Sequence, residues 1–410
     1  MNLSDRLLSL ITLIMGMLIF ILPSAIVALP KGGVVVAFML LISLLGLGLN
    51  RCKFALSRWE RYFVFSFVGY FAIIALNLWW FDGNLKDLDT PSRLILVLPI
   101  FFFLRKSDVS VNWVVWGVVM AVLFIFSNQV SLKFNHSALY TFQDNSGILT
   151  LYASILGIAS LFFISKSKSL VLNTVFALSA LSGITASLLL GGRGVWVAAF
   201  LSIIVLLLLN PMAWRKRINF AILLTFIATI LVAYVVPNTG VKGRIGMAIS
   251  NVSSWMANDQ SNTSSGARLE MWKASYKIVK QNLIIGVGED NYAAHQRVLI
   301  EQGKIDPFVG KFHHPHGEYI TSLVEQGLLG LFALLMVFLI PVRYALRLAK
   351  ESQYYYESKP LILTAIVIAL HYIFYSVTSG VFDHQSTALF YAVFMVITLG
   401  LIKSISRKVT

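Results

Sequence analysis

Three basic side chains in this sequence are of the types that act in group transfer from a phosphorylated substrate. Arg193 stands alone in the run Gly-Gly-Arg-Gly, and Arg268 opens an amphipathic stretch. His316 lies near the end of the longest polar segment. Guanidinium groups bind phosphate oxygens in a bidentate manner, and a neutral imidazole accepts a proton from a hydroxyl near neutral pH. On one side of a membrane, these are the parts needed to handle a pyrophosphate-linked substrate.

Two interpretations of Arg193 are open. An arginine at a membrane interface often serves only as a snorkelling anchor. Alternatively, Gly192 and Gly194 allow a ligand to approach the backbone closely, and the amides at the start of the following helix add positive potential. We favour an anion contact, because anchoring arginines prefer the cytoplasmic side and Arg193 is expected on the other.

Arg268 has a plain alternative as well, since a charge on an amphipathic helix is usually solvated. Gly266 precedes it in the sequence Ser-Ser-Gly-Ala-Arg, so the first amides of this helix could assist in binding an anion.

The cluster His313-His314-Pro315-His316 allows three readings. Closely spaced imidazoles can bind zinc, a polar loop can be chemically inert, or His316 can act as a general base. We favour the general base, with Glu318 orienting it and His313 and His314 contacting substrate. The sequence predicts no metal site and no cofactor.

Four further ionisable residues raise separate possibilities. Asp87 and Asp89 form an Asp-Leu-Asp pattern that binds a metal in many glycosyltransferases, although a solvated loop is the simpler reading. Glu325 and His371 fall inside predicted membrane spans, where ionisable groups are costly. We expect Glu325 near His316, and we expect His371 to pack or to form a hydrogen bond between helices.

The composition defines the class of protein. Hydrophobic residues make up 58% of the chain and charged residues 12%, and the mean hydropathy is +0.79. Such a chain is an integral membrane protein. Its net charge of +15 is best explained by cytoplasmic loops rich in lysine and arginine, so no nucleic-acid partner is expected. The one cysteine excludes an intrachain disulfide.

The hydropathy pattern predicts an all-α polytopic protein of about twelve transmembrane helices. The expected spans are residues 7–29, 33–48, 62–80, 94–104, 111–126, 147–164, 170–190, 194–209, 220–236, 319–340, 361–379 and 388–402. We read the first as a retained helix rather than a cleaved signal peptide, since no clear cleavage site follows it. Lysine and arginine are concentrated in the loops on the side of the termini, which places both termini in the cytoplasm.

The chain therefore divides into residues 1–236 with helices one to nine, a large outer loop at 237–316, and residues 317–410 with helices ten to twelve. Within the loop, residues 268–281 and 291–302 show helical spacing of apolar side chains and predict two short amphipathic helices.

Several of these motifs resemble a known family. His316-Gly317, followed by Gly327 and Gly330, is similar to the signature of bacterial O-antigen ligases. The runs Gly-Gly-Arg-Gly-Val-Trp, Gly-Ala-Arg-Leu-Glu-Met-Trp and Leu-Ile-Ile-Gly-Val-Gly also resemble that superfamily, which includes O-antigen polymerases and pilin oligosaccharyltransferases. The position after the histidine differs: the family usually has Asn, Ser or Gln, and this chain has Gly317.

The resemblance implies a GT-C-like fold and an inverting glycosyl transfer that needs neither metal nor ATP. The donor would be a polysaccharide on undecaprenyl pyrophosphate, and the acceptor a sugar hydroxyl of lipid A–core in lipopolysaccharide biosynthesis. Arg193 and Arg268 would hold the pyrophosphate, and His316 would activate the acceptor hydroxyl. The enzyme would lie in the bacterial inner membrane, among its lipids, with the site facing the periplasm.

Two alternatives remain open from the sequence. An O-antigen polymerase or a protein oligosaccharyltransferase would use the same donor with a different acceptor. A membrane transporter belongs to another class, and it should carry charges at the membrane midplane, whereas the notable charges here lie at one face.

Overall fold

The computed structural model describes residues 3–409 except 30–31, 50–54, 136, 139–145, 165–168, 210–226, 228–230, 232–233, 236–240, 259–261, 290 and 352–357. Every regular element in this described part is helical. In chain order the elements are α1 (Leu3–Ala28), α2 (Gly33–Leu49), α3 (Arg58–Trp80), η1 (Leu85–Leu88), α4 (Asp89–Leu96), α5 (Leu98–Leu104), α6 (Asn112–Phe134), α7 (Ser146–Phe163), α8 (Leu170–Leu190), α9 (Arg193–Leu209), α11 (Val241–Asn258), α12 (Ser264–Val279), α13 (Tyr292–Glu301), η4 (Pro307–Lys311), α14 (Glu318–Glu325), α15 (Gly327–Lys350), α16 (Lys359–Tyr375) and α17 (Gln385–Val409).

Within the described residues, seven helices are long and apolar enough to cross a membrane: α1, α3, α6, α7, α8, α15 and α17. Three shorter apolar helices, α2, α9 and α16, pack among them. The predicted segment at 220–236 lies almost entirely outside the described residues, so the count of twelve stays a prediction. The polytopic all-α class is confirmed.

Two predicted spans are interrupted in the structure. Residues 94–104 belong to two helices, α4 and α5, which meet at Val97. Pro99 in the first turn of α5 explains the break, because proline lacks an amide N–H and disfavours helix in the residue before it. Residues 319–340 are likewise divided between α14 and α15, at Gln326.

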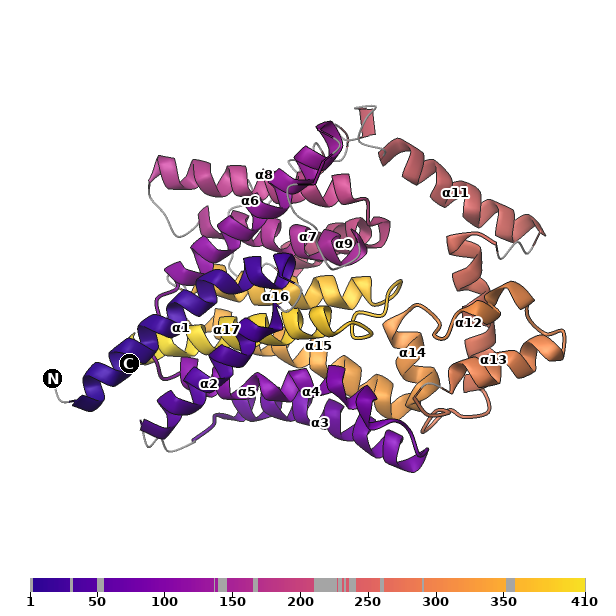
Figure 1. The fold of residues 1–410 in the computed structure, drawn as a ribbon, viewed down its shortest axis with the longest axis horizontal. Coiled ribbons are helices and arrows are strands. Elements are labelled where there is room, and N and C mark those ends of the chain that lie inside the picture. The colour runs from indigo at the N-terminus through magenta and orange to yellow at the C-terminus, as the bar shows by residue number, and fades with distance from the viewer. Residues whose placement is uncertain are drawn as a thin grey trace.

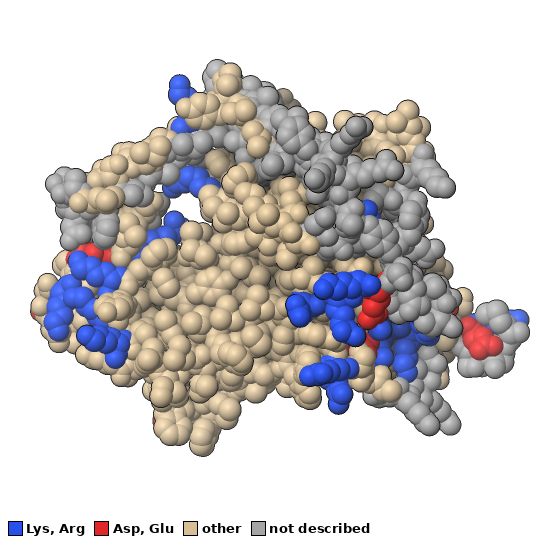
Figure 2. Space-filling view, turned by 180° about the vertical axis from the view of Figure 1, so that it is seen from behind, with Lys and Arg blue, Asp and Glu red and all other residues tan. Residues whose placement is uncertain are grey.

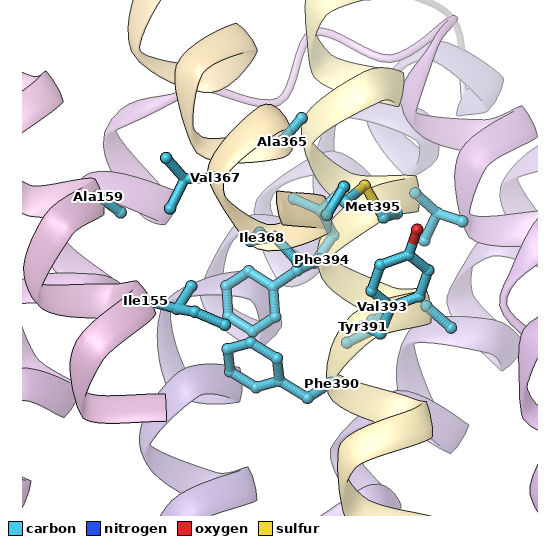
Figure 3. Packing of buried hydrophobic residues seen from close by; sticks show 14 of the residues in the cluster. Ile155, Ala159, Ala365, Val367, Ile368, Phe390, Tyr391, Val393, Phe394 and Met395 are labelled. Atoms are coloured by element: carbon cyan, nitrogen blue, oxygen red, sulfur yellow. The ribbon is translucent and has the colours of Figure 1, made fainter. Parts of the chain in front are cut away.

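The core lies where α7, α16 and α17 meet. Figure 3 shows Ile155 and Ala159 of α7 facing α16 and α17, on the side where the rings of Phe390 and Phe394 lie. The centroids of these two rings are 4.4 Å apart. In the most apolar 18-residue stretch of α17, 89% of the residues are buried. This helix is therefore enclosed by protein rather than by lipid. This central packing gives α9 and α16 fixed positions for the site.

Charged side chains gather at two ends of the molecule. Figure 2 shows lysine and arginine at both ends of the view, separated by a broad band of uncharged surface. Figure 1 shows the two termini at one end and α12 and α13 at the other. An uncharged band between two charged ends is the arrangement a membrane requires.

The segment that contains α11, α12 and α13 holds more helix than the sequence predicted. The two expected helices correspond to α12 and α13, while α11 was not predicted. Helix α12 is the central one, because it contacts α11, α13, η4 and α14. It thereby links this outer segment to the helix that begins just after His316.

Candidate active site

Arg193 owes its position to a tight connection between two helices. Gly191 ends α8 in the left-handed conformation, with φ of 80°, which a glycine adopts without strain. The carbonyl of Gly192 accepts the first hydrogen bonds of α9, so Arg193 is the first residue of that helix. The indole of Trp196 donates to Ser187 O at 3.1 Å and holds α9 against the end of α8.

The flanking glycines are required by neighbouring protein atoms. A Cβ atom at position 192 would lie 2.9 Å from the side chain of Thr150. At position 194 it would lie 2.6 Å from Thr378 Oγ1. The sequence interpretation assigned these glycines to a close ligand, and the structure adds a packing reason for both.

Arg268 lies one turn into α12. Thr263 caps this helix by accepting a hydrogen bond from Gly266 N at 3.1 Å. The guanidinium Nε is buried and has no hydrogen-bond partner among the described residues. Burial lowers the pKa of Arg268, Tyr375 raises it, and Arg193 lowers it further. Because the guanidinium still remains charged at neutral pH, a buried cation here is ready to meet an anion.

The two arginines line one cavity, which we call the basic cavity. Its volume is about 460 Å³, and its walls come from α9, α12, α16 and the residues that follow α16. Below Arg193 the wall continues along α9 through Val197 and Leu201, and Phe374 of α16 faces the same space. The lining of the basic cavity therefore combines two arginines with several apolar side chains.

His316 is held in a strained conformation in the loop before α14. Its φ of 53° lies in the left-handed region, which is uncommon for any residue with a side chain. Trp272 of α12 donates a hydrogen bond to Pro315 O at 3.2 Å. On the other side, Glu318 N donates to Ser376 O at 2.8 Å. Contacts from α12 and from the end of α16 thus fix the loop on both sides of the histidine.

Gly317 has a steric role in the same loop. Its backbone is extended, and a Cβ atom there would lie 3.1 Å from Val377 O. The departure from the usual family residue at this position therefore coincides with close contact to the chain after α16.

The surroundings of His316 favour the neutral form of its imidazole. Burial lowers its pKa from the usual 6.5, and the positive charges of His314 and Arg268 lower it further, while Asp383 raises it. A lowered pKa keeps the ring neutral at pH 7, which is the form that accepts a proton. Arg268 thus acts on both the basic cavity and the imidazole.

The other two histidines of the cluster differ from each other. His314 Nε2 lies 3.8 Å from Asp383 Oδ2, and its ring centroid is 4.9 Å from that of His316. His313 is exposed and belongs to neither cavity described here. Within the described part of the chain, no three His, Cys, Asp or Glu side chains are grouped so that they could hold a metal ion.

A second cavity, the acidic cavity, lies on the His314 side of His316. Six carboxylate side chains line it: Asp87, Asp89, Glu289, Glu318, Glu325 and Asp383. Glu318 is buried, and its carboxylate accepts a hydrogen bond from Phe382 N at 2.9 Å. Burial and the nearby Asp383 raise the pKa of Glu318.

The structure places the other ionisable residues that the sequence singled out, which are Asp87, Asp89, Glu325 and His371. Asp87 and Asp89 line the acidic cavity together with Glu325 and His314, so the Asp-Leu-Asp loop lies beside the candidate site. Asp89 also forms an ion pair with Arg93 at 3.1 Å. His371 lies apart, in the core, where its Nε2 is 3.1 Å from Ser154 Oγ. The predicted hydrogen bond between helices is confirmed for His371.

Three residues of the site carried no signal in the sequence. Asp383, Tyr375 and Trp272 reach His316 or Arg268 only through the tertiary fold. Asp383 sits in the loop between α16 and α17, and nothing in its spacing from His314 predicts their contact.

The glycines of the resembling motifs act in a backbone junction. Gly286 and Gly327 have φ of 71° and 68°, and a Cβ atom at either would lie within 2.4 Å of backbone atoms. Val287 N donates to Val324 O at 2.9 Å, and Leu328 N donates to Leu283 O at 2.9 Å. Residues 283–288 thereby pair with the break between α14 and α15.

Comparison with known proteins supports the family resemblance of the sequence motifs. The chain is 25% identical over 350 residues to an uncharacterized protein of Haemophilus influenzae, covering 83% of this chain and 86% of that protein. The family model described as O-Antigen ligase matches residues 176–335, the part that contains Arg193, Arg268 and His316. This family groups glycosyltransferase-like enzymes that act on polyprenyl-linked sugars. Over residues 176–335, the chain is therefore similar to the O-antigen ligase family.

Proposed function

We propose that this protein is an O-antigen ligase, which transfers a polysaccharide from undecaprenyl pyrophosphate to a sugar hydroxyl of lipid A–core. The observation that carries the proposal is the arrangement of three side chains from separate elements. Arg193 and Arg268 line one cavity, and Arg268 also lowers the pKa of His316.

The basic cavity offers arginines for the pyrophosphate and apolar side chains for the polyprenyl chain of a lipid-linked donor. Two guanidiniums at the mouth would bind the phosphate oxygens and stabilise the charge that develops on the leaving group. Val197 and Leu201 would contact the polyprenyl chain as it runs along α9. Val197 is 59% exposed, as expected for a side chain that meets lipid.

The reaction uses His316 as a general base. The neutral imidazole takes the proton of the acceptor hydroxyl while the hydroxyl oxygen forms a bond to the anomeric carbon of the donor. The bond from that carbon to the pyrophosphate oxygen breaks, and its electron pair stays on the pyrophosphate. Attack opposite the leaving group inverts the anomeric centre. The arginines supply charge stabilisation, so the transfer calls on neither a metal ion nor ATP.

The cellular arrangement follows from the same proposal. The outer segment at 237–316 faces the periplasm, both termini lie in the cytoplasm, and the protein resides in the inner membrane. Donor and acceptor both reach the site from the outer leaflet.

The test is a lipopolysaccharide profile from a deletion strain that carries wild-type or variant protein at matched expression. Wild type should restore long-chain ladders, whereas His316→Ala, Arg193→Ala and Arg268→Ala should leave bare core and accumulate lipid-linked polymer. His295→Ala and Arg297→Ala are matched controls, because both residues lie on α13 outside the basic and acidic cavities.

The acceptor product separates this proposal from its relatives. A deletion strain with normal ladders would refute the ligase assignment. Core capped with a single repeat unit would identify a polymerase, and loss of pilin glycosylation would identify a protein oligosaccharyltransferase. Flux of a labelled solute through proteoliposomes would identify a transporter.

A further inference from the structure

The acidic cavity has a chemistry opposite to that of the basic cavity. Its six carboxylates come from five separate parts of the chain, and the basic side chains in its lining are those of Lys86 and His314. Some of these carboxylates already have protein partners, as Asp89 does with Arg93 and Glu318 with Phe382 N. An acidic surface of this kind repels phosphate and carboxylate groups.

Two hydroxyls in the same lining point to a ligand. Thr321 is 8% exposed and Ser322 is 2% exposed, and both lie on α14. Neither side-chain oxygen has a hydrogen-bond partner among the described residues, although both are buried. Burying a hydroxyl without a partner costs free energy. Such groups are rare in folded proteins unless something else satisfies them.

The available groups favour a polyhydroxyl ligand over a metal ion. Among the described side chains no cluster is suited to a metal, whereas carboxylates and hydroxyls both accept hydrogen bonds from sugar hydroxyls. The cavity volume is about 260 Å³. Pockets that enclose drug-sized ligands usually measure about 300–1,000 Å³. This space therefore suits the end of a saccharide rather than a long segment of it.

His316 is linked to a lining residue of each cavity. Arg268 lines the basic cavity and lowers the pKa of His316, and His314 lines the acidic cavity with its ring centroid 4.9 Å from that of His316. A hydroxyl presented from the acidic cavity would lie near the base, and the donor sugar would be held by its pyrophosphate in the basic cavity.

We infer that the acidic cavity is the acceptor subsite, and that it selects a terminal sugar free of phosphate and carboxylate groups. This inference rests on the proposed ligase function and adds to it the chemical class of the acceptor sugar. Neutral sugars and amino sugars fit the cavity, while uronic acids and phosphorylated sugars are rejected by its charge. Thr321 and Ser322 would bind hydroxyls of the accepted ring.

Binding can be measured without the transfer reaction. The full-length protein in detergent would be examined by saturation-transfer NMR with methyl glycosides of gluco, galacto and manno configuration. Each would be compared with its uronide, which differs only in the carboxylate. At least one neutral glycoside should receive saturation, and its uronide should not. The double variant Asp87→Asn/Glu289→Gln should admit the uronide.

A conservative variant tests the hydroxyls. Thr321→Val keeps the shape of the side chain and removes a group that has no protein partner. We expect about three- to tenfold weaker glycoside binding with an unchanged or higher Tm, since the folded protein loses no hydrogen bond. Thr174→Val is the matched control, because Thr174 lies exposed on α8 and outside this cavity, and it should leave binding unchanged.

The inference is overturned if no neutral glycoside binds, if the uronides bind as well as their neutral partners, or if Thr321→Val leaves binding unchanged. The ligase proposal and the acceptor-subsite inference can each fail without the other. Ladders that depend on His316 without selective glycoside binding would remove only the acceptor subsite. Selective binding without dependence of the ladders on this chain would remove only the ligase assignment.

Discussion

In the proposed mechanism Arg268 would serve two tasks, because it lines the basic cavity and also lowers the pKa of His316. The pKa of His316 is lowered from 6.5, so the base stays neutral until the pH falls through that lowered value. The acid limb of the rate profile should therefore lie below pH 6.5 in the wild type. It marks where His316 becomes protonated and transfer is lost.

Replacing Arg268 should shift that limb. Arg268→Gln removes a positive charge that lowers the pKa of His316, so the imidazole should protonate at higher pH and the acid limb should move upward. Arg193→Gln is the control, because Arg268 is among the charges that most affect the pKa of His316 and Arg193 is not among them. The measurement is the pH dependence of residual transfer by purified protein in proteoliposomes. Acid limbs at the same pH in Arg268→Gln and Arg193→Gln would contradict the effect of Arg268 on the pKa of His316.

Arg193 should respond differently to two substitutions. Arg193→Gln should slow transfer by about 10²–10³-fold, the usual effect of removing one group that stabilises developing charge. Arg193→Lys keeps the charge and loses the bidentate geometry, so it should retain an intermediate rate. Single-turnover rates with lipid-linked donor would test this order. Equal rates for the Lys and Gln variants would show that charge at this position is not the operative property.

At the level of single residues, the sequence suggested three candidate site residues and missed the residues that contact them. Arg193, Arg268 and His316 were recognisable because their types and their glycine neighbours carry local information. Asp383 and Tyr375 were not, since their contribution depends on the loop after α16 reaching Glu318 and Arg268. Such contacts join residues far apart in the chain, so no periodic pattern in the sequence predicts them.

At the level of elements, the glycine junction between residues 283–288 and the start of α15 offers a sharp test. Gly327→Ala places a side chain at φ of 68° and also 2.2 Å from Ile284 O. Gly303→Ala is the matched control, because Gly303 has φ of 66° and no atom within 4 Å of an added Cβ.

The two variants share the backbone penalty of about 1–2 kcal/mol and differ in the clash. The clash should cost about 1–3 kcal/mol more, so Gly327→Ala should have the lower Tm and should lose transfer activity. Thermal unfolding in detergent, read beside the transfer rate, measures both effects. Equal Tm values would show that residues 283–288 and the start of α15 can move apart without a loss of stability.

The elements themselves were predictable where hydropathy was uninterrupted. Long apolar runs predicted α1, α3 and α8 within four residues at each end, because the bilayer demands both length and apolarity. Helix α17 continues to Val409, beyond the predicted end at residue 402. The breaks at Val97 and Gln326 were missed, since a hydropathy average does not register a single proline or a left-handed glycine. Helix α11 was missed although Val241, Ile245, Ile249 and Val252 recur at helical spacing, so the sequence did carry a signal for it.

For the whole molecule, the side of the membrane is the main structural prediction. The Asp108–Arg407 pair at 3.1 Å belongs to the end that carries the C-terminus, and α13 belongs to the opposite end (Figure 1). The distribution of lysine and arginine predicts that the first end is cytoplasmic and the second periplasmic.

Cysteine labelling can test this orientation, because the chain has one native cysteine, Cys52. In a Cys52→Ser background, Gln302→Cys should react with a membrane-impermeant maleimide in cells whose outer membrane has been permeabilised. Ser110→Cys should react only after the inner membrane is opened. Both positions are exposed. The reverse labelling pattern would place the site in the cytoplasm and exclude a periplasmic acceptor.

The backbone junction at residues 283–288 has one more consequence. It leaves three large apolar side chains, Leu283, Ile284 and Ile285, pointing outward with exposed fractions of 49%, 65% and 40%. Side chains of this kind settle into the acyl boundary of a bilayer. The carbonyls of Leu283 and Ile284 accept hydrogen bonds from Leu328 N and Leu329 N at the start of α15. We therefore expect the insertion of these side chains into the bilayer to set the height of His316 and the arginines above the lipid tails.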